Sequence, residues 1–263
     1  MAGQDNVVKV PGMPEQPEDA PELYWRLFKI VSRPLRRLHR VRVAGAENLP
    51  GPGQGAILAA LHNGALDAVF VAIAASARNR AVRFVADEDI CNVPVIGPAI
   101  REAGCIPIAS YKGQATDPDK IRQALAQATD VLRRGGLVGL FPEGIIHPFF
   151  KTRYAYQFKT GIIRLALASG APIIPTWARG AGAVFPWLSN IKLPTGHIYA
   201  ALPVWTPAQV VVHFGKPFVL PPDLCLDAPY ERIREQALRL QFALDDLRNA
   251  HRKRYTPNFP DAY

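Results

Sequence analysis

The chain has 263 residues, which is enough for one large domain with a buried core or for two small ones. Hydrophobic residues make up 49% and charged residues 20%, which is typical of an ordinary globular protein. The formal net charge of +9 indicates an anionic partner: a nucleic acid, an anionic membrane or an acidic small substrate. The three cysteines lack the spacing of a metal or redox site, so we expect a reducing compartment and no structural disulfide.

Residues 1–22 contain four prolines among acidic and small polar residues and lack the apolar core of a signal peptide. We therefore expect them to be disordered or loosely packed. The longest apolar stretch, residues 55–77, has His62, Asn63 and Asp67 near its middle, and such polar groups are costly in hydrocarbon. A buried strand, a polar turn and a buried helix explain this stretch better, so the sequence predicts no transmembrane helix.

Residues 23–40 predict an amphipathic basic helix, because apolar residues recur along one helical stripe with cations beside it. Pro34 removes one backbone donor, so we expect a kink or two short helices. The helix either packs its apolar stripe on the domain or lies as an anchor in a membrane interface. The dominance of cations on its polar face favours the anchor. In that interpretation seven residues contact the membrane: Trp25, Arg26, Phe28, Lys29, Arg33, Arg36 and Arg37.

From residue 41 onward, strand patterns alternate with helix patterns. We expect strands at residues 41–43, 56–61, 82–86, 106–109, 137–141, 172–176 and 210–214, and helices at residues 67–77, 117–134, 161–169 and 230–250. Strands separated by helices of this length predict the α/β class. We expect residues 41–263 to form a single domain with a mainly parallel mixed sheet flanked by helices. Residues 180–209, with scattered Pro, Gly and Trp, are the least regular stretch.

The first motif with catalytic potential is the segment from His62 to Asp67. An apolar strand leads to His62, Gly64 allows the backbone to bend, and Asp67 opens the next helix. Side chains five positions apart on a straight helix point about 140° away from each other, so a turn is needed to bring imidazole and carboxylate together. Asp67 is also well placed to cap the helix, and the spacing alone fits a cap beside an incidental histidine.

Three later segments add to this motif. Residues 141–144 (FPEG) follow an apolar strand and put Glu143 on a loop beyond a strand end, where ligands bind in open α/β sheets. Residues 104–108 (GCIPI) form a short strand after a glycine. Residues 171–175 (APIIP) form another apolar strand between prolines. Taken singly, each segment is also an ordinary turn or core strand.

In this order the four segments resemble the four blocks of the glycerolipid and lysophospholipid acyltransferase family, whose first block is H-x-x-x-x-D and whose third is F-P-E-G. The resemblance spans residues 41–219, and residues 83–109 resemble especially the acyltransferase domain of 2-acylglycerophosphoethanolamine acyltransferases. It implies direct acyl transfer from acyl-CoA or acyl-carrier protein as co-substrate, without a metal or other cofactor. It also implies that His62 is a general base, that Asp67 orients it, and that substrate contacts Asn63, Pro142, Glu143 and Gly144.

The residue types fit this chemistry. A hydroxyl with a pKa of about 15 must lose its proton as it attacks a thioester, and histidine is the base best matched to neutral pH. A carboxylate on the other ring nitrogen sets the tautomer and stabilises the imidazolium. The thioester is already activated, so no protein nucleophile is needed, and the sequence has no G-x-S-x-G elbow.

Two departures from the family pattern leave the acceptor open. Where many members have an arginine at the end of the second block, this chain has Ala109 and Ser110, with Lys112 as the nearest cation. The third block continues with residues 145–147 (IIH) instead of an arginine-containing segment. Lys112, together with Lys151, Arg153 and Lys159, could form a substitute phosphate site, although solvated charges explain most of them.

We therefore expect O-acylation of a lysophospholipid or related glycerolipid. The alternatives are acylation of a non-phosphorylated glycolipid or aminolipid, or an inactive membrane-binding protein with the same fold. The expected partners are the lipid acceptor, the acyl donor and an anionic membrane surface, with a peripheral location on the cytoplasmic face. No zinc-ligand spacing, RNP segment or basic coil is present, so nucleic acid is not an expected partner.

Overall fold

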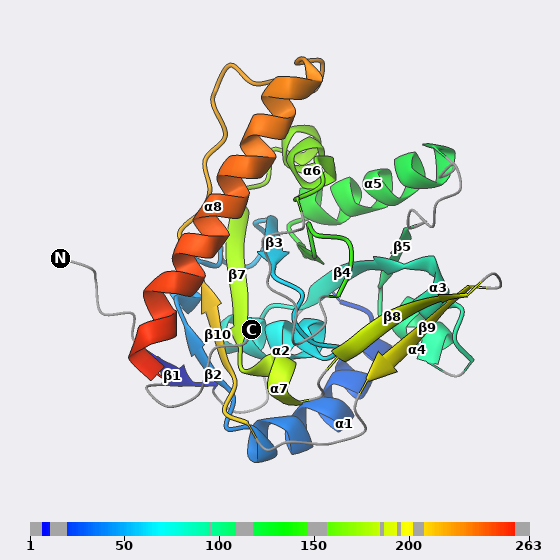
Figure 1. The fold of residues 1–263 in the computed structure, drawn as a ribbon, viewed down its shortest axis with the longest axis vertical. Helices are drawn as coiled ribbons and strands as arrows, with labels where there is room; N and C mark the ends of the chain where they lie inside the picture. Colours follow the sequence, from blue (N-terminus) through cyan, green and yellow to red (C-terminus); the bar gives the residue numbers. More distant parts are fainter. Residues whose placement is uncertain are drawn as a thin grey trace.

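The computed structural model describes residues 7–10, 20–94, 96–108, 118–146, 157–184, 187–193, 196–201 and 208–255. Its centre is an eight-stranded sheet in the order β1-β2-β10-β7-β3-β6-β4-β5 (Figure 1). The strands of this sheet are β1 (Val8–Lys9), β2 (Arg42–Ala44), β3 (Ala56–Ala60), β4 (Val82–Asp87), β5 (Ile106–Ile108), β6 (Leu137–Leu140), β7 (Ile173–Arg179) and β10 (Val211–Phe214).

The sheet is mixed, as the sequence predicts. Strands β7, β3, β6, β4 and β5 run parallel to one another, β10 is antiparallel to β7 and parallel to β2, and β1 is antiparallel to β2. The α-helices are α1 (Glu22–Leu38), α2 (Asp67–Ala75), α3 (Glu88–Cys91), α4 (Ile96–Glu102), α5 (Pro118–Arg133), α6 (Gly161–Ser169), α7 (Ala181–Val184) and α8 (Tyr230–Tyr255). Two short 3-10 helices lie at Ala46–Asn48 and Ser76–Arg78.

Strand β3 separates the two halves of the core. Leu58 and Ala60 pack with α1, α2 and α7, whereas Ile57, Ala59 and Leu61 pack with α5, α6 and α8. All of these side chains are buried, because the strand is covered on both faces as in other parallel α/β sheets. The same burial holds the backbone rigid up to the point where the chain leaves the sheet at His62.

Helix α1 corrects two expectations from the sequence. It is one helix through Pro34 instead of two short ones, while the alternative of a kink stays a prediction. The carbonyl that Pro34 leaves unpaired, that of Ile30, belongs to a residue that is 71% exposed. Trp25 and Phe28 lie in the core at 1% and 7% exposure, so they cannot enter a membrane from this position. The two aromatic rings pack edge-to-face, 5.3 Å apart. The helix therefore uses its apolar stripe to complete the domain core.

Two further segments are more regular than the sequence suggests. Within residues 1–22, which we expected to be disordered or loosely packed, β1 pairs with β2 and Val10 is buried. Within residues 180–209, helix α7 precedes a two-stranded antiparallel sheet of β8 (Trp187–Leu193) and β9 (Gly196–Ala201). Strand pairing explains both differences: β1 pairs with β2, which is distant in the sequence, and β8 pairs with β9, which follows it. Local residue preferences do not reveal such pairing.

Candidate active site

The pair predicted from H-x-x-x-x-D spacing is formed. His62 follows β3, the chain turns, and Asp67 begins α2, so that His62 Nδ1 lies 3.2 Å from Asp67 Oδ2. The hydrogen bond assigns the proton to Nδ1, which leaves Nε2 as the basic nitrogen of the neutral ring. The His62 side chain is 15% exposed, so it can still meet a substrate.

Asp67 is buried and binds the turn that precedes it. Besides His62, its Oδ2 accepts the backbone N–H groups of Asn63 at 2.6 Å and Gly64 at 2.7 Å. Asp67 is the first residue of α2, so its side chain orders the turn and does not act as the helix cap considered from the sequence. Burial raises the pKa of Asp67, and the hydrogen bonds from His62, Gly64 and Asn63 oppose that rise. The carboxylate thus fixes both the turn and the imidazole.

Glu143 contacts the turn between His62 and Asp67 directly. Its Oε2 accepts the backbone N–H of His62 at 2.8 Å, and its side chain is 6% exposed. Pro142 is buried beside it. The loop after β6 therefore helps to hold the His62 backbone in place, a role that the sequence did not indicate. The predicted contact of Glu143 with acceptor hydroxyls is a separate role and stays a prediction.

An aromatic stack supports the imidazole. The Phe141 ring stacks on the His62 ring with centroids 3.8 Å apart, and the Phe84 ring stacks on Phe141 with centroids 5.7 Å apart. Phe84 belongs to β4 and Phe141 follows β6, so neighbouring strands supply the stack. Stacking restricts rotation of the ring and keeps Nε2 directed at one place. The FPEG motif marked the position of Phe141 but gave no sign of this contact.

Gly144 and Lys159 form the side of the site next to Glu143. Gly144 has φ +72°, a conformation that favours glycine, and donates its N–H to the carbonyl of Phe141 at 3.0 Å. The backbone N–H of Lys159 binds the carbonyl of Pro142 at 2.8 Å. The exposed Lys159 side chain lies against Gly144, at the place where a β-carbon would project. The Lys159 cation thus lies beside the FPEG motif.

Helix α7 closes the other side of the turn. A β-carbon on Gly182 would come within 2.9 Å of the carbonyl oxygen of Asn63, so the backbones approach closely there. Asn63 itself is 6% exposed, and its backbone amide binds Asp67. The expected substrate contact of the Asn63 side chain stays a prediction. The sequence marks residues 180–209 as the least regular stretch and gives no sign that this segment contributes to the site.

The other cations proposed from the sequence for phosphate binding, Lys112, Lys151 and Arg153, lie outside the described residues. The same holds for the second-block departure at Ala109 and Ser110. In the part of the chain that the structure describes, no cluster of His, Cys, Asp or Glu has the size and geometry to hold a metal ion. Over the same residues, no helix combines the length and apolar character needed to cross a bilayer.

Comparison with known proteins gives a consistent picture. A family model described as Acyltransferase matches residues 40–179, which is more than half of the chain. An uncharacterised protein of Mycobacterium tuberculosis is 31% identical over 180 residues, covering 62% of this chain and 45% of that protein. A chloroplastic 1-acyl-sn-glycerol-3-phosphate acyltransferase of Arabidopsis thaliana is 25% identical over 160 residues, covering 61% of this chain and 42% of that protein. The chain thus spans less than half the length of these relatives.

A solved structure shares the fold. The 1-acyl-sn-glycerophosphate acyltransferase PlsC from Thermotoga maritima superposes with a TM-score of 0.54 at 21% identity, covering 88% of this chain and 83% of that chain. At this identity the likeness concerns the fold alone. It agrees with the single α/β domain and the helix-flanked mixed sheet predicted from the sequence.

Proposed function

Because the chain belongs to the acyltransferase family, we propose that it transfers a fatty acyl chain from an acyl thioester to a free hydroxyl of a lysophospholipid or related glycerolipid. The observation that carries the proposal is the His62–Asp67 pair at 3.2 Å, on a turn held by Glu143 and stacked on Phe141. This arrangement holds a general base rigidly at the end of a buried strand, with its basic nitrogen available to a substrate.

The proposed reaction proceeds in two steps. In the first, His62 Nε2 takes the proton of the acceptor hydroxyl as its oxygen attacks the thioester carbonyl, giving a tetrahedral oxyanion and an imidazolium. Asp67 stabilises the imidazolium through Nδ1–H. In the second, the intermediate collapses, the carbon–sulfur bond breaks, and the imidazolium returns the proton to the leaving thiolate. The products are an ester and a free thiol, and the base is regenerated without a cofactor.

The acceptor in this proposal carries a phosphate. Two named relatives, from Arabidopsis thaliana and Thermotoga maritima, are described as acyltransferases of 1-acylglycerol phosphates. In this chain the exposed cation nearest the FPEG motif is Lys159, beside Gly144, among the residues that the structure describes. A lysine can pair with phosphate as a point charge, although it lacks the bidentate geometry of arginine. A non-phosphorylated glycolipid or aminolipid acceptor would leave this cation without a role.

The outer face of α1 is the surface proposed to meet the membrane. Trp25 and Phe28 are in the core, but Arg26, Lys29, Arg33 and Arg37 are exposed on the opposite side. Three apolar side chains of the same helix are also exposed: Ile30, Val31 and Leu38. Cations with apolar residues beside them suit the interface of an anionic leaflet, where each cation contributes about 1 kcal/mol.

A direct transfer assay tests the proposal. Purified protein is incubated with acyl-CoA or acyl-carrier protein and a panel of lysophospholipids, glycolipids and aminolipids, and the products are identified by lipid mass spectrometry. We expect an acylated phospholipid from the wild type, a rate about 10²–10⁴-fold lower for His62→Ala, and weaker use of phosphorylated acceptors by Lys159→Met. Transfer that survives His62→Ala within a few-fold would refute the mechanism. Exclusive use of uncharged acceptors would refute the assigned acceptor class.

A further inference from the structure

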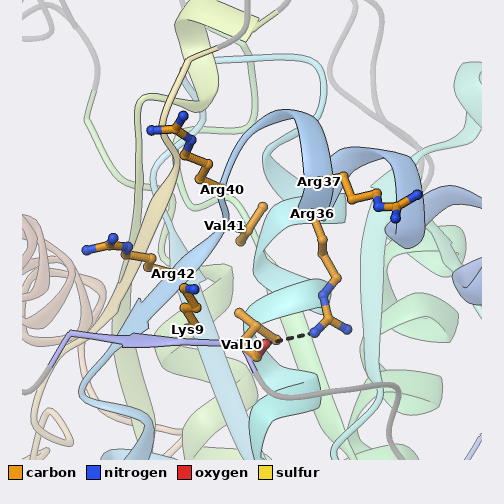
Figure 2. A pocket seen from close by; sticks show the side chains of 7 residues that line it. All are labelled: Lys9, Val10, Arg36, Arg37, Arg40, Val41 and Arg42. Atoms are coloured by element: carbon orange, nitrogen blue, oxygen red, sulfur yellow. Dashed lines mark hydrogen bonds between the residues drawn. The ribbon is translucent and has the colours of Figure 1, made fainter.

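A second candidate site, lined mainly by cationic side chains, is separate from His62. A pocket of about 530 Å³ opens between β1, the end of α1 and the start of β2 (Figure 2). Seven residues line it: Lys9, Val10, Arg36, Arg37, Arg40, Val41 and Arg42. Five of these are cationic and the other two are valines, so the described part of the chain supplies no carboxylate to the lining. Like charges gathered around one cavity repel one another, and a bound anion removes that repulsion.

Arg36 is the fixed element of the pocket. It is partly buried, and its Nη2 donates to the carbonyl oxygen of Val10 at 2.8 Å, which ties α1 to β1 (Figure 2). Burial lowers the pKa of Arg36, as expected for a guanidinium in a partly apolar setting. Val10 and Val41 are buried and form the floor. The pocket therefore exists because β1 pairs with β2 and brings Val10 opposite α1.

Arg40 is held at the rim by an unusual backbone. It follows His39, the C-cap of α1, and has φ +43°, the left-handed conformation in which helices usually end with glycine. An arginine at this position brings a cation to the pocket where glycine would bring none. Arg37 and Arg40 are exposed and Arg42 is partly exposed, so their long side chains can turn toward an anion.

The pocket is near the catalytic site but separate from it. Arg42 pairs with Val211 of β10, and Val211 pairs with Arg179 at the end of β7, while Ala60 at the end of β3 pairs with Thr176 of β7. Arg42 and the turn at His62 therefore lie at the same end of the sheet. Three strand spacings of about 4.8 Å, roughly 14 Å in all, separate their strands. An occupant of the pocket would not fill the space around His62.

We propose that this pocket binds the phosphate group of a ligand other than the acyl acceptor. Two sources present that chemistry at this end of the sheet: the headgroup of a bilayer phospholipid, and the phosphates of a soluble compound. Arginine is suited to both because its planar guanidinium binds phosphate oxygens in pairs. The site does not depend on acyl transfer, so binding is measured without acyl donor or acceptor.

The test uses the full chain and pyrophosphate as the soluble probe, with binding measured by isothermal titration calorimetry. The pocket variant is the double substitution Arg40→Gln and Arg42→Gln. The matched control, Arg122→Gln and Arg134→Gln, removes the same charge from exposed positions at α5, on the other face of the sheet. A second pocket variant, Lys9→Gln with Arg37→Gln, changes two exposed side chains and guards against misfolding, which circular dichroism monitors.

We expect both pocket variants to bind the probe at least about tenfold more weakly and the control to match the wild type. A parallel sedimentation assay with phosphatidylcholine vesicles, with and without phosphatidylglycerol, identifies the source. Loss of phosphatidylglycerol-dependent sedimentation in the Arg40→Gln and Arg42→Gln variant, which leaves the outer face of α1 unchanged, supports a lipid headgroup. Unchanged sedimentation with lost pyrophosphate binding supports a soluble phosphate compound. The proposal is overturned if neither assay distinguishes the pocket variants from the control, whether because all bind equally or because none binds.

Discussion

Replacing Asp67 with Asn tests the catalytic geometry most directly. The substitution keeps the size of the side chain but removes the charge that faces His62 Nδ1 at 3.2 Å and the backbone amides of Asn63 and Gly64 at 2.6 and 2.7 Å. All three hydrogen bonds end on Oδ2, so one amide oxygen can accept them, but a neutral amide cannot stabilise the positive charge that the imidazole gains when it takes a proton. We expect kcat to fall about 10²–10⁴-fold, which corresponds to about 3–5 kcal/mol of barrier.

The same substitution has a second, smaller effect on folding. Each charge-assisted hydrogen bond contributes a few kcal/mol at most, and loss of the buried charge offsets part of this, so we expect the free energy of unfolding to fall by about 1–3 kcal/mol. Acyl transfer is measured with a water-soluble short-chain acceptor, and stability by urea denaturation. The rate effect should therefore persist under conditions in which the variant is fully folded.

Asp119→Asn is the matched control, because Asp119 also lies in the first turn of a helix but is exposed and pairs with Arg122 at the surface. It should change neither the rate nor the stability appreciably. If Asp67→Asn keeps wild-type kcat within a few-fold while folded, the carboxylate does not orient the base. If the Asp119 control loses activity as well, the measured effect is one of general stability.

Three further outcomes are expected. Phe141→Leu should lower kcat more than it raises KM, because the stack at 3.8 Å positions the His62 ring without holding the acceptor; an effect confined to KM would contradict this. Burial, with the nearby His251 and Arg179, lowers the pKa of His213 to about 3, so acid favours the unfolded state, where histidine titrates near 6.5. Stability should be complete above about pH 6.5 and fall by about 2 kcal/mol between pH 7 and 5, and His213→Phe should flatten this dependence in urea denaturation. Deleting residues 1–40 should unfold the domain, as seen by circular dichroism, because it removes four buried apolar side chains of α1, each contributing about 1.5–3 kcal/mol; a folded truncation would show that α1 is dispensable.

Residue pattern alone was sufficient for the central strands and for a turn between His62 and Asp67, whereas the catalytic role expected of this pair came from the family resemblance. Residues 56–61 are uninterruptedly apolar, as a strand covered on both faces must be, and the chain can bring His62 to Asp67 only through a turn. Both conclusions rest on neighbours in sequence. The departure at Ala109 and Ser110 lies outside the described part of the chain, and the phosphate-binding consequences of the missing arginines stay predictions.

The tertiary structure decided what depends on residues far apart in the chain. An amphipathic stripe specifies that α1 buries one face, but a membrane and a protein core are both apolar, and the packing of Trp25 against the domain decides between them. The hydrogen bond from His62 to Glu143 joins residues 81 positions apart. The basic pocket requires Val10 of the N-terminal segment to reach α1 through strand pairing. Local preferences carry no information on such contacts, because the free energy that forms them comes from burial and pairing in the folded chain.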